Sequence, residues 1–377
     1  MADFVIIGGG IYGCTVAWEL ARRGADVHLL EAKTIASGAS GGLGKRGVRA
    51  NGRDLRELPF MRLAYEQWET LHEQIDGETG YERLGHLLLI EREADYASAA
   101  AHAWLQEQQG IPTRLIAADE LHEIEPYLSE QVIAALYCPQ DGVADHTQTT
   151  KSMAKAAQKH GAIIQENTIV TGLERQGNKV TAVLAQTKNA EIRIPVHKHV
   201  FLLSNSHALK FIQEQFGITL PVWSMLPQVI RTATVNPVPV KHLIGHANRT
   251  LAIKPLANNE VMISGGWHGR QNPETGQAET VPEQVEGNRA EAVAVYPILA
   301  DVPIIEAAAD RSEVLSADGI PIIDTLSAAE NMIIAVGWSG HGWAIAPAVG
   351  KVMAEWALSN SKPSLLKPFC YKRFART

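Results

Sequence analysis

The sequence predicts an α/β protein that combines a parallel sheet with a second, mixed or antiparallel sheet. Near each end of the chain, a short apolar strand (4–7 and 332–336) leads directly into a glycine-rich turn and a helix of small residues, a pattern typical of parallel sheets. In the middle, residues 220–266 form short apolar runs separated by prolines, as antiparallel strands do. The chain of 377 residues is long enough for two such units.

The N-terminal motif predicts a dinucleotide-binding βαβ unit. Gly8 allows a tight turn after the first strand, Gly10 lets the backbone approach a pyrophosphate, and Gly13 lets the following helix pack closely. The N-terminus of that helix directs its free N–H groups at the phosphates. The second strand ends on Glu31, whose carboxylate can accept both hydroxyls of an adenosine ribose but would repel a 2′-phosphate. The motif therefore favours FAD or NAD over NADP.

The second glycine turn, residues 337–343, narrows this choice. It follows the strand at 332–336 and precedes a small-residue helix that we expect to end near residue 358. A helix N-terminus placed here can stabilise negative charge, such as that on the N1–O2 side of a reduced flavin. Nicotinamide enzymes need no such second element. The two turns together favour FAD.

The elements between the two turns follow from the spacing of their apolar residues. A basic, glycine-rich segment (36–53) is expected to be a loop that can fold against a cofactor, followed by a helix at about 58–74 and a buried strand at 81–90. The α/β pattern then returns, with a helix at 148–160 and strands at 162–165, 170–174, 180–186 and 200–203. These elements are expected to continue the first sheet and its helical cover. Strands at 222–234, 251–253 and 260–266 then form the second sheet, and a helix follows at 285–296.

Composition and charge exclude several classes of function. Of the residues, 46% are hydrophobic and 20% charged, and the formal net charge is −7, so the surface offers nucleic acid or anionic lipid no general attraction. No apolar run approaches the ~20 residues of a membrane span, and Asp3 stands where a signal peptide needs basic residues, so we expect a cytoplasmic protein. Cys14, Cys138 and Cys370 lie far apart and have no metal-binding spacing, so no metal site is expected.

Together these motifs resemble those of the D-amino-acid oxidase superfamily of FAD-dependent oxidoreductases, in particular its glycine oxidase and sarcosine oxidase branch. The resemblance covers nearly the whole chain, through the segments 8–13 with Glu31, 37–42, 85–89, 136–142, 161–162, 170–174, 316–323 and 337–342. It implies a discontinuous, Rossmann-like FAD-binding domain made of residues 1–80, 145–215 and 310–377. It also implies a substrate-binding domain of residues 81–144 and 216–309, built on the mixed or antiparallel sheet.

The resemblance also implies which residues hold the FAD. The pyrophosphate would lie on the first turn, the ribose on Glu31, the adenine on the backbone of Val170, the ribityl chain near residues 40–45 and the flavin pyrimidine edge against the second turn. The implied cofactor-binding residues are Gly8, Gly10, Ile11, Tyr12, Gly13, Glu31, Ala32, Lys33, Ser40, Gly44, Lys45, Val170, Ser204, Gly337, Gly340, His341, Gly342 and Trp343. No cysteine or histidine occupies the family's flavin-linkage positions, so the FAD is expected to be noncovalent.

The chemistry that the resemblance implies is oxidation of a C–N bond in a small amino acid or a secondary or N-methyl amine. A hydride passes to flavin N5 and the imine is hydrolysed, while the protein positions the substrate and holds its carboxylate. Several amino-acid oxidases hold this carboxylate with an arginine just before the Asp-Gly-Ile-Pro turn. Counting back from Asp318, that position here is Glu313, with Arg311 two residues away.

Basic residues of the second domain are therefore candidate anchors for the substrate. Arg231, Lys254 and Arg270 qualify, and Arg231 is preferred because a guanidinium can bind a carboxylate through two hydrogen bonds. His341 is expected to act in the site through its place in the second turn, and Trp267 with Trp343 to line the substrate pocket. The candidate catalytic residues are thus His341, Arg231 and Trp267.

Two alternative functions remain open from the sequence. One is a flavoprotein subunit of a multi-subunit amino-acid or opine dehydrogenase that passes electrons to a partner, and the other is a non-enzymatic FAD-binding protein. The electron acceptor is open as well. Sarcosine-oxidase-like relatives activate oxygen with a lysine on a strand of the substrate domain, whereas the corresponding Met262 and Ile263 are uncharged. We therefore expect a slow reaction with oxygen unless Lys45 or His341 takes over that role.

Overall fold

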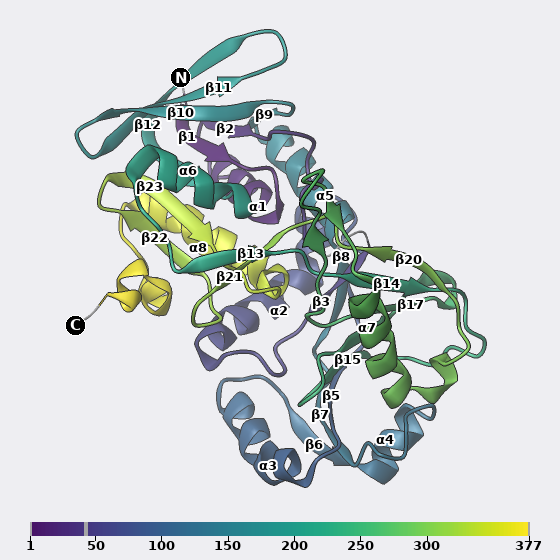
Figure 1. The fold of residues 1–377 in the computed structure, drawn as a ribbon. Coiled ribbons are helices and arrows are strands. Elements are labelled where there is room, and N and C mark those ends of the chain that lie inside the picture. Colours follow the sequence, from purple (N-terminus) through teal and green to yellow (C-terminus); the bar gives the residue numbers. More distant parts are fainter. Residues whose placement is uncertain (1, 41–43, 376–377) are drawn as a thin grey trace.

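The computed structural model describes residues 2–40 and 44–375 and forms two lobes, each built on a large sheet (Figure 1). Both ends of the chain belong to the same lobe, drawn at the top, and the chain crosses between the lobes several times. Gly41 and Gly42, which the family resemblance includes, lie outside the described residues.

The first sheet carries the predicted parallel strands. Its order is β10 (Ile169–Gln176), β11 (Lys179–Gln186), β12 (Glu191–Leu202), β1 (Ala2–Ile7), β2 (Val27–Leu30) and β9 (Ile163–Gln165), with β23 (Ala329–Val336) paired to β12 and β22 (Ile322–Leu326) to β23. The strands β9, β2, β1, β12 and β23 run parallel, and β10, β11 and β22 are antiparallel to their neighbours. The α/β, Rossmann-like fold predicted from the two end motifs is confirmed.

Helices bury both faces of this sheet. On one face lie α1 (Ile11–Ala21), α5 (His146–Lys159) and α8 (Ala346–Ser359), and α2 (Leu58–Gln74) packs on α8. The helices α1 and α8 approach so closely that a Cβ at Gly350 would lie 2.4 Å from the Thr15 Cγ2 atom. The other face is covered by α6 (Ser206–Phe216) and by the β10–β11 hairpin.

The second sheet is mixed, as predicted. Its order is β20 (Ile304–Ala308), β14 (Val229–Thr232), β17 (Val261–Ser264), β16 (Ala252–Pro255), β15 (Leu243–His246), β5 (His86–Ile90), β7 (Ala134–Cys138) and β6 (Arg114–Ala117). Only β15 and β5 pair in parallel. The helices α7 (Pro282–Val295) and α4 (Ala118–Ile124) pack on one face of this sheet. The helix α3 (Glu93–Gln108) packs in a separate cluster with residues of β5 and β7.

Several elements differ from the sequence prediction. The segment 36–53 is not a loop throughout, because it contains the strand β3 (Lys45–Val48), which pairs with β8 (Gly142–Asp145); β8 also pairs with β4 (Glu82–Arg83). The single strand predicted at 81–90 is split into β4 and β5, since Gly85 between them has a φ of +74°. The region 222–234 is split as well, and its first part, β13 (Val222–Met225), pairs with β21 (Glu313–Ser316).

A small hairpin, β18 (Arg270–Gln271) with β19 (Ala278–Glu279), occupies the polar segment before α7. None of the helices within residues 2–40 and 44–375 is both long and apolar enough to cross a membrane. The division into an FAD-binding and a substrate-binding domain at the boundaries given above stays a prediction.

Candidate functional site

Four predicted cofactor-binding residues lie in a row at the carboxyl edge of the first sheet. Glu31, Gly8, Ser204 and Gly337 follow the neighbouring parallel strands β2, β1, β12 and β23 directly or within two residues. Ligands of open parallel sheets bind outside this edge. The sheet topology therefore brings together residues that are up to 329 positions apart (337 minus 8).

The first glycine turn is built for close approach. A Cβ at Gly13 would lie 1.9 Å from the Gly8 carbonyl oxygen, so α1 can pack on the turn only with glycine there. Gly8 itself has a φ of +115°. Gly10 differs, because no described atom lies within 4 Å of the position of its Cβ and its φ is −77°. Gly10 thus borders open space at the N-terminus of α1, which has no side-chain cap.

The Glu31 carboxylate is oriented by two backbone N–H groups. Gly9 N donates to Oε2 at 2.7 Å and Lys33 N donates to Oε1 at 2.9 Å. The segment before β10 runs alongside, since Thr168 N donates to the Glu31 carbonyl oxygen at 2.8 Å. This contact brings Val170, the predicted adenine neighbour, to the same corner of the sheet, while Ala32 and Lys33 are exposed.

The second glycine turn packs directly on the first. Gly337 and Gly340 have positive φ angles of +82° and +78°, and the turn leads into a short 3₁₀ helix, η4 (Gly342–Ile345), ahead of α8. Tyr12 donates its hydroxyl hydrogen to the Gly342 carbonyl oxygen. The buried Tyr12 ring, predicted to touch the cofactor, is thereby used to join the two turns.

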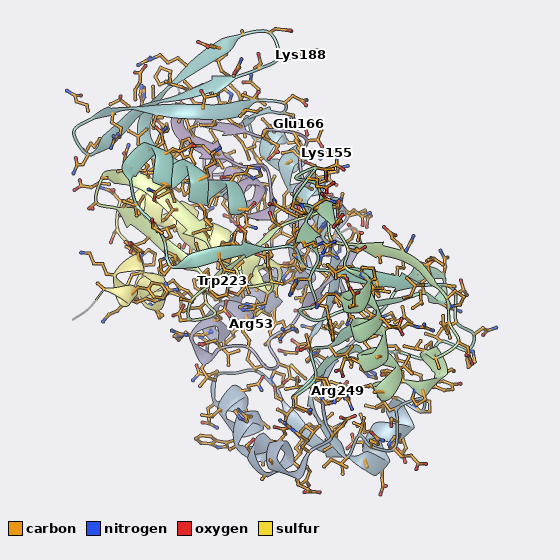
Figure 2. All side chains as sticks on the ribbon, viewed as in Figure 1. Arg53, Lys155, Glu166, Lys188, Trp223 and Arg249 are labelled. Carbon is orange, nitrogen blue, oxygen red and sulfur yellow. The ribbon has the colours of Figure 1, made fainter. Side chains whose placement is uncertain are left out.

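Behind the second turn lies a buried charged cluster that the sequence analysis did not identify. Arg53 donates to the His341 carbonyl oxygen at 2.7 Å and lies 3.2 Å from His341 Nδ1, and Glu57 Oε2 lies 3.3 Å from the same Nδ1. Arg53 and Glu57 are themselves 3.3 Å apart. Figure 2 shows Arg53 between the two lobes. The i, i+4 spacing of an arginine and a glutamate at 53 and 57 is the only local signal for this pair.

The charges in this cluster set one another's ionisation. Burial would raise the pKa of Glu57, but Arg53 and His341 outweigh it and hold that pKa below its usual value. Burial lowers the pKa of His341, with a smaller opposing contribution from Glu57. His341 is therefore neutral at pH 7.

Two buried polar atoms near η4 have no hydrogen-bond partner within the described residues. They are Nε1 of Trp343 and Nε2 of His146, whose rings contact each other with centroids 6.2 Å apart. Burial, together with Arg46, Arg311 and Lys254, lowers the pKa of His146 to about 3, so this imidazole is neutral. A bound ligand with suitable polar groups would satisfy both atoms.

The second sheet contributes Lys254 and Met262 from neighbouring strands. They are directly paired in the β16–β17 register and so lie on the same face, the one toward β3. Met262 Cε is 3.7 Å from the Cβ position of Gly44, just before β3, and β3 in turn contacts η4. Burial, with Arg46 and Arg49 nearby, lowers the pKa of Lys254 to about 7. The glycine turns and this face of the second sheet thus meet at β3.

Arg231 and Trp267 do not join this arrangement in the way the sequence predicts. Arg231 is paired with Met262 on the same sheet face, but its guanidinium makes ion pairs with Glu260 at 3.3 Å and Glu306 at 2.9 Å. Trp267 packs on the opposite side, where a Cβ at Gly287 of α7 would meet its ring at 2.3 Å. The geometry therefore does not favour either as a substrate contact.

The remaining predicted positions are also accounted for. Arg270 is exposed and pairs with Glu279 at 2.8 Å, and Lys45 pairs with Glu82 at 2.7 Å. Ser40 donates its hydroxyl hydrogen to Glu313, which is buried and whose pKa is raised by that burial. The position of the family's carboxylate-binding arginine is therefore occupied by a buried carboxyl.

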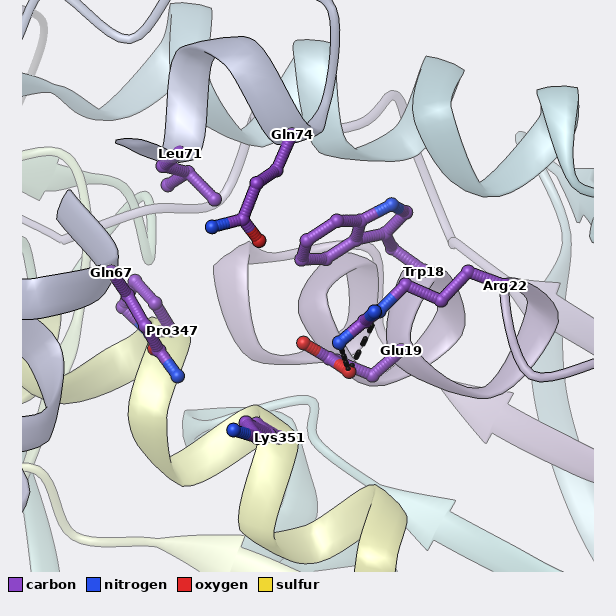
Figure 3. A pocket seen from close by; sticks show the side chains of 8 residues that line it. All are labelled: Trp18, Glu19, Arg22, Gln67, Leu71, Gln74, Pro347 and Lys351. Atoms are coloured by element: carbon purple, nitrogen blue, oxygen red, sulfur yellow. Dashed lines mark hydrogen bonds and ion pairs between the residues drawn. The ribbon is translucent and has the colours of Figure 1, made fainter. Parts of the chain in front are cut away.

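A surface pocket elsewhere is separate from this site. It holds about 100 Å³ between α1, α2 and α8 and is lined by Trp18, Glu19, Arg22, Gln67, Leu71, Gln74, Pro347 and Lys351 (Figure 3). Its Glu19 is ion-paired with Arg22 at 2.7 Å. None of its lining residues belongs to either glycine turn or to the face of the second sheet toward β3, so we assign it no role in the chemistry.

The residues at the strand ends fit an FAD. Gly10 leaves room for a pyrophosphate at a helix N-terminus, Glu31 faces the same edge, and Trp343 and His146 offer unpartnered polar atoms further along. The fold and the site thus define a dinucleotide-binding α/β oxidoreductase.

Comparisons with known proteins agree. Residues 3–356 match the DAO family model, described as FAD dependent oxidoreductase, and the chain belongs to this family of FAD-dependent enzymes. The chain is similar to L-proline dehydrogenase from P. horikoshii, with a TM-score of 0.87, 26% identity and coverage of 99% of this chain and 97% of that one.

Curated relatives show the same similarity. Sarcosine oxidase subunit beta of Arthrobacter sp. is 23% identical over 99% of this chain and 91% of its own length. The 4-methylaminobutanoate oxidase (formaldehyde-forming) of Paenarthrobacter nicotinovorans is 26% identical over 95% of this chain, but the chain spans only 44% of that relative's length.

Proposed function

We propose that this enzyme oxidises the C–N bond of a small amino acid or of a secondary or N-methyl amino acid. The observation that carries the proposal is the meeting of the two glycine turns with the Lys254-bearing sheet face at β3. The similarity to sarcosine oxidase subunit beta and to L-proline dehydrogenase supports the amine substrate class. A bound FAD would supply the two-electron oxidation by accepting a hydride from the carbon that bears the amine, and water would hydrolyse the resulting imine.

The residues of the chain bind and orient the reactants. The cationic side chains on the β3 side hold the substrate carboxylate, and this attraction places the amine-bearing carbon beside the second turn. His341 is kept neutral and fixed by Arg53, so it contributes a hydrogen-bonding edge and not a charge. The helix α8 and η4 direct their N-terminal N–H groups toward the turn, where they stabilise developing negative charge.

Anaerobic titration of the purified holoprotein tests the proposal. A panel of amino acids and N-methyl amino acids is added while the visible absorbance of the flavin is recorded, and dithionite provides the fully reduced reference. Bleaching by at least one amine, with equimolar release of an oxo acid or aldehyde, is the expected result. A flavin that dithionite reduces but no amine reduces would contradict the proposal.

A second candidate function keeps the same chemistry but changes the electron acceptor. The chain covers 91% of a relative whose name describes a subunit of a larger enzyme, sarcosine oxidase subunit beta. In that case the chain is a flavoprotein subunit that passes electrons to a partner protein. Rapid substrate-dependent reduction of a soluble dye, combined with slow reduction of oxygen, would favour this form over a self-contained oxidase.

A further inference from the structure

The sheet face toward β3 carries two basic residues in very different electrostatic states. Lys254, Met262 and Arg231 form a cross-strand row over β16, β17 and β14. Arg231, at the outer end of this row, is paired with two carboxylates. Lys254, at the inner end, is 7% exposed and has no carboxylate within ion-pair distance among residues 2–40 and 44–375. A buried cation without a counter-ion is costly unless a ligand supplies one.

A second cation without an ion pair lies beside β3, on the side of β3 that faces the second sheet. Arg49 follows β3, and its Cγ is 4.0 Å from the Cβ position of Gly47, a residue of β3 that also contacts Leu243 of the second sheet. Its guanidinium donates to the Asn51 carbonyl oxygen at 2.9 Å and forms no ion pair with any described residue. Burial is the largest cause that lowers the pKa of Lys254, and the positive charges of Arg46 and Arg49 lower it further.

The neighbouring carboxylates are already engaged. Asp141 accepts hydrogen bonds from Tyr65 and from the N–H groups of Ala50 and Asn51 at 2.6 and 3.0 Å. Glu57 is paired with Arg53 and His341. Neither is within ion-pair distance of Arg49 or Lys254. Burial lowers the pKa of Arg49 and the charges of Asp141 and Glu57 oppose that shift, but neither Arg49 nor Lys254 has an ion-pair partner of its own among the described residues, so an anionic ligand can supply one.

The FAD accounts for other sites. Its pyrophosphate is expected at the N-terminus of α1, beside Gly10, and the negative charge of a reduced flavin at the second turn ahead of α8. At the position where the family resemblance places a carboxylate-binding arginine, this chain has Glu313, a buried carboxyl that supplies no positive charge. One substrate carboxylate would neutralise one of the two cations and leave the other unpaired.

We propose that the natural substrate carries two anionic groups, as an amino or imino dicarboxylate does, with Lys254 binding one group and Arg49 the other. This proposal rests on the proposed C–N oxidation and specifies its substrate class. The second anionic group selects the substrate, because a buried, unpaired cation disfavours any substrate that lacks it.

Matched substrates test the charge requirement at constant shape. N-methylaspartate, glutamate and iminodiacetate are each compared with the monoamide that replaces one carboxylate, such as N-methylasparagine and glutamine. For at least one pair, we expect kcat/KM for flavin reduction to be about tenfold or more higher for the diacid. Equal rates within every pair that reacts would overturn the inference and leave the proposed function intact.

Variants identify the residue that reads the second charge. Lys254→Met should reduce the preference for the diacid to within about threefold by raising KM more than it lowers kcat. Lys210→Met, which removes an exposed lysine from α6, is the matched control. Arg231→Met should also retain the preference. A loss of preference in Arg231→Met but not in Lys254→Met would overturn the assignment.

A binding measurement keeps the inference separate from catalysis. Succinate and malonate, which cannot be oxidised at a C–N bond, should perturb the spectrum of the oxidised holoprotein at concentrations about tenfold or more below those needed with propionate. Lys254→Met should abolish this difference. If no amine reduces the flavin but the dicarboxylates still bind selectively, the proposed function fails and the site assignment stands; equal binding of mono- and dicarboxylates would overturn the assignment.

Discussion

Tyr12 stacks on Trp338, with ring centroids 3.7 Å apart and ring planes inclined by only 9°. The first residue belongs to the helix after the N-terminal glycine turn and the second to the C-terminal glycine turn. Their contact makes one surface out of two motifs that the chain places at its opposite ends. Loss of either turn should therefore weaken FAD binding by the whole protein and not only by one half of it.

Alanine substitutions at Gly10 and at Gly13 should have different effects on FAD binding and on stability. A Cβ at Gly10 meets no described atom within 4 Å, so Gly10→Ala should fold with a Tm within about 3 °C of the wild-type apoprotein. The added methyl group enters the pyrophosphate space, so FAD affinity should fall by about tenfold or more. Isothermal titration with FAD and thermal unfolding of the apoprotein measure both effects.

Gly13→Ala is the matched comparison. Its Cβ would lie 1.9 Å from the Gly8 carbonyl oxygen, so α1 must move and the apoprotein itself should lose stability. If Gly10→Ala binds FAD normally, the pyrophosphate does not lie where the first turn predicts.

Glu31→Ala should weaken FAD binding through the ribose. A hydrogen bond to a charged group contributes about 1.5–3 kcal/mol, which corresponds to roughly a tenfold or greater loss of affinity. Fluorescence titration of the apoprotein with FAD measures this loss, and Glu107→Ala, at an exposed position of α3, is the control. Unchanged affinity would show that the carboxylate serves only the N–H groups of Gly9 and Lys33.

Glu57→Gln should destabilise the protein and change its response to acid. Removing one partner of a buried ion pair costs about 3–5 kcal/mol, because Arg53 is left uncompensated. The folded-state pKa of Glu57 lies below its unfolded value of 4.5, so its contribution is complete above pH 4.5 and is lost as the pH falls through the folded pKa. Urea unfolding between pH 3 and pH 7 should show a smaller acid sensitivity in the variant. Parallel curves for the two proteins would contradict this assignment.

The sequence predicted the parts of the structure that local chemistry determines. Gly8 and Gly13 lie in a tight turn and Glu31 lies at a strand end, so the spacing alone was enough to predict their places in the fold. The strand β3 was missed because its pairing with β8 depends on residues about 100 positions away.

The basic residues show the same limit. Arg231 and Lys254 are equivalent in the sequence, as single cations in apolar strands. Only the register reveals that Glu306 lies beside Arg231 and that Lys254 is buried without an acid. Burial and cross-strand neighbours are tertiary properties, and they decide which cation is available to a substrate.

Oxygen reactivity should depend on the charge of Lys254. The sequence predicts that oxygen reoxidises the reduced flavin slowly, because Met262 and Ile263 are uncharged. Lys45 and His341 are the two residues expected to be able to replace the missing lysine. Lys45 is paired with Glu82 and His341 is neutral, but Lys254 lies directly across from Met262. A fixed positive charge favours the formation of superoxide. Stopped-flow reoxidation in air-saturated buffer should therefore be slow above pH 7 and several-fold faster at pH 6, and slow at both in Lys254→Met. A rate that is fast and independent of pH would show that another group activates oxygen.

Lys254 should also destabilise the apoprotein, in a pH range that its pKa defines. The folded-state pKa of about 7 is below the unfolded value of 10.5, so between these values the unfolded state binds more protons than the folded state. The stability of the wild-type apoprotein therefore gains from rising pH across this window, with a limiting slope of about 1.4 kcal/mol per pH unit from this group. Below pH 7 the cost of burying the charge is complete, and Lys254→Met removes it.

Urea unfolding of both apoproteins at pH 6.5, 8 and 9.5 measures the difference in free energy of unfolding. We expect the variant to be the more stable protein at pH 6.5 and its advantage to shrink steadily toward pH 9.5, whereas a constant difference would mean that Lys254 keeps an ordinary pKa and is hydrated in the folded protein.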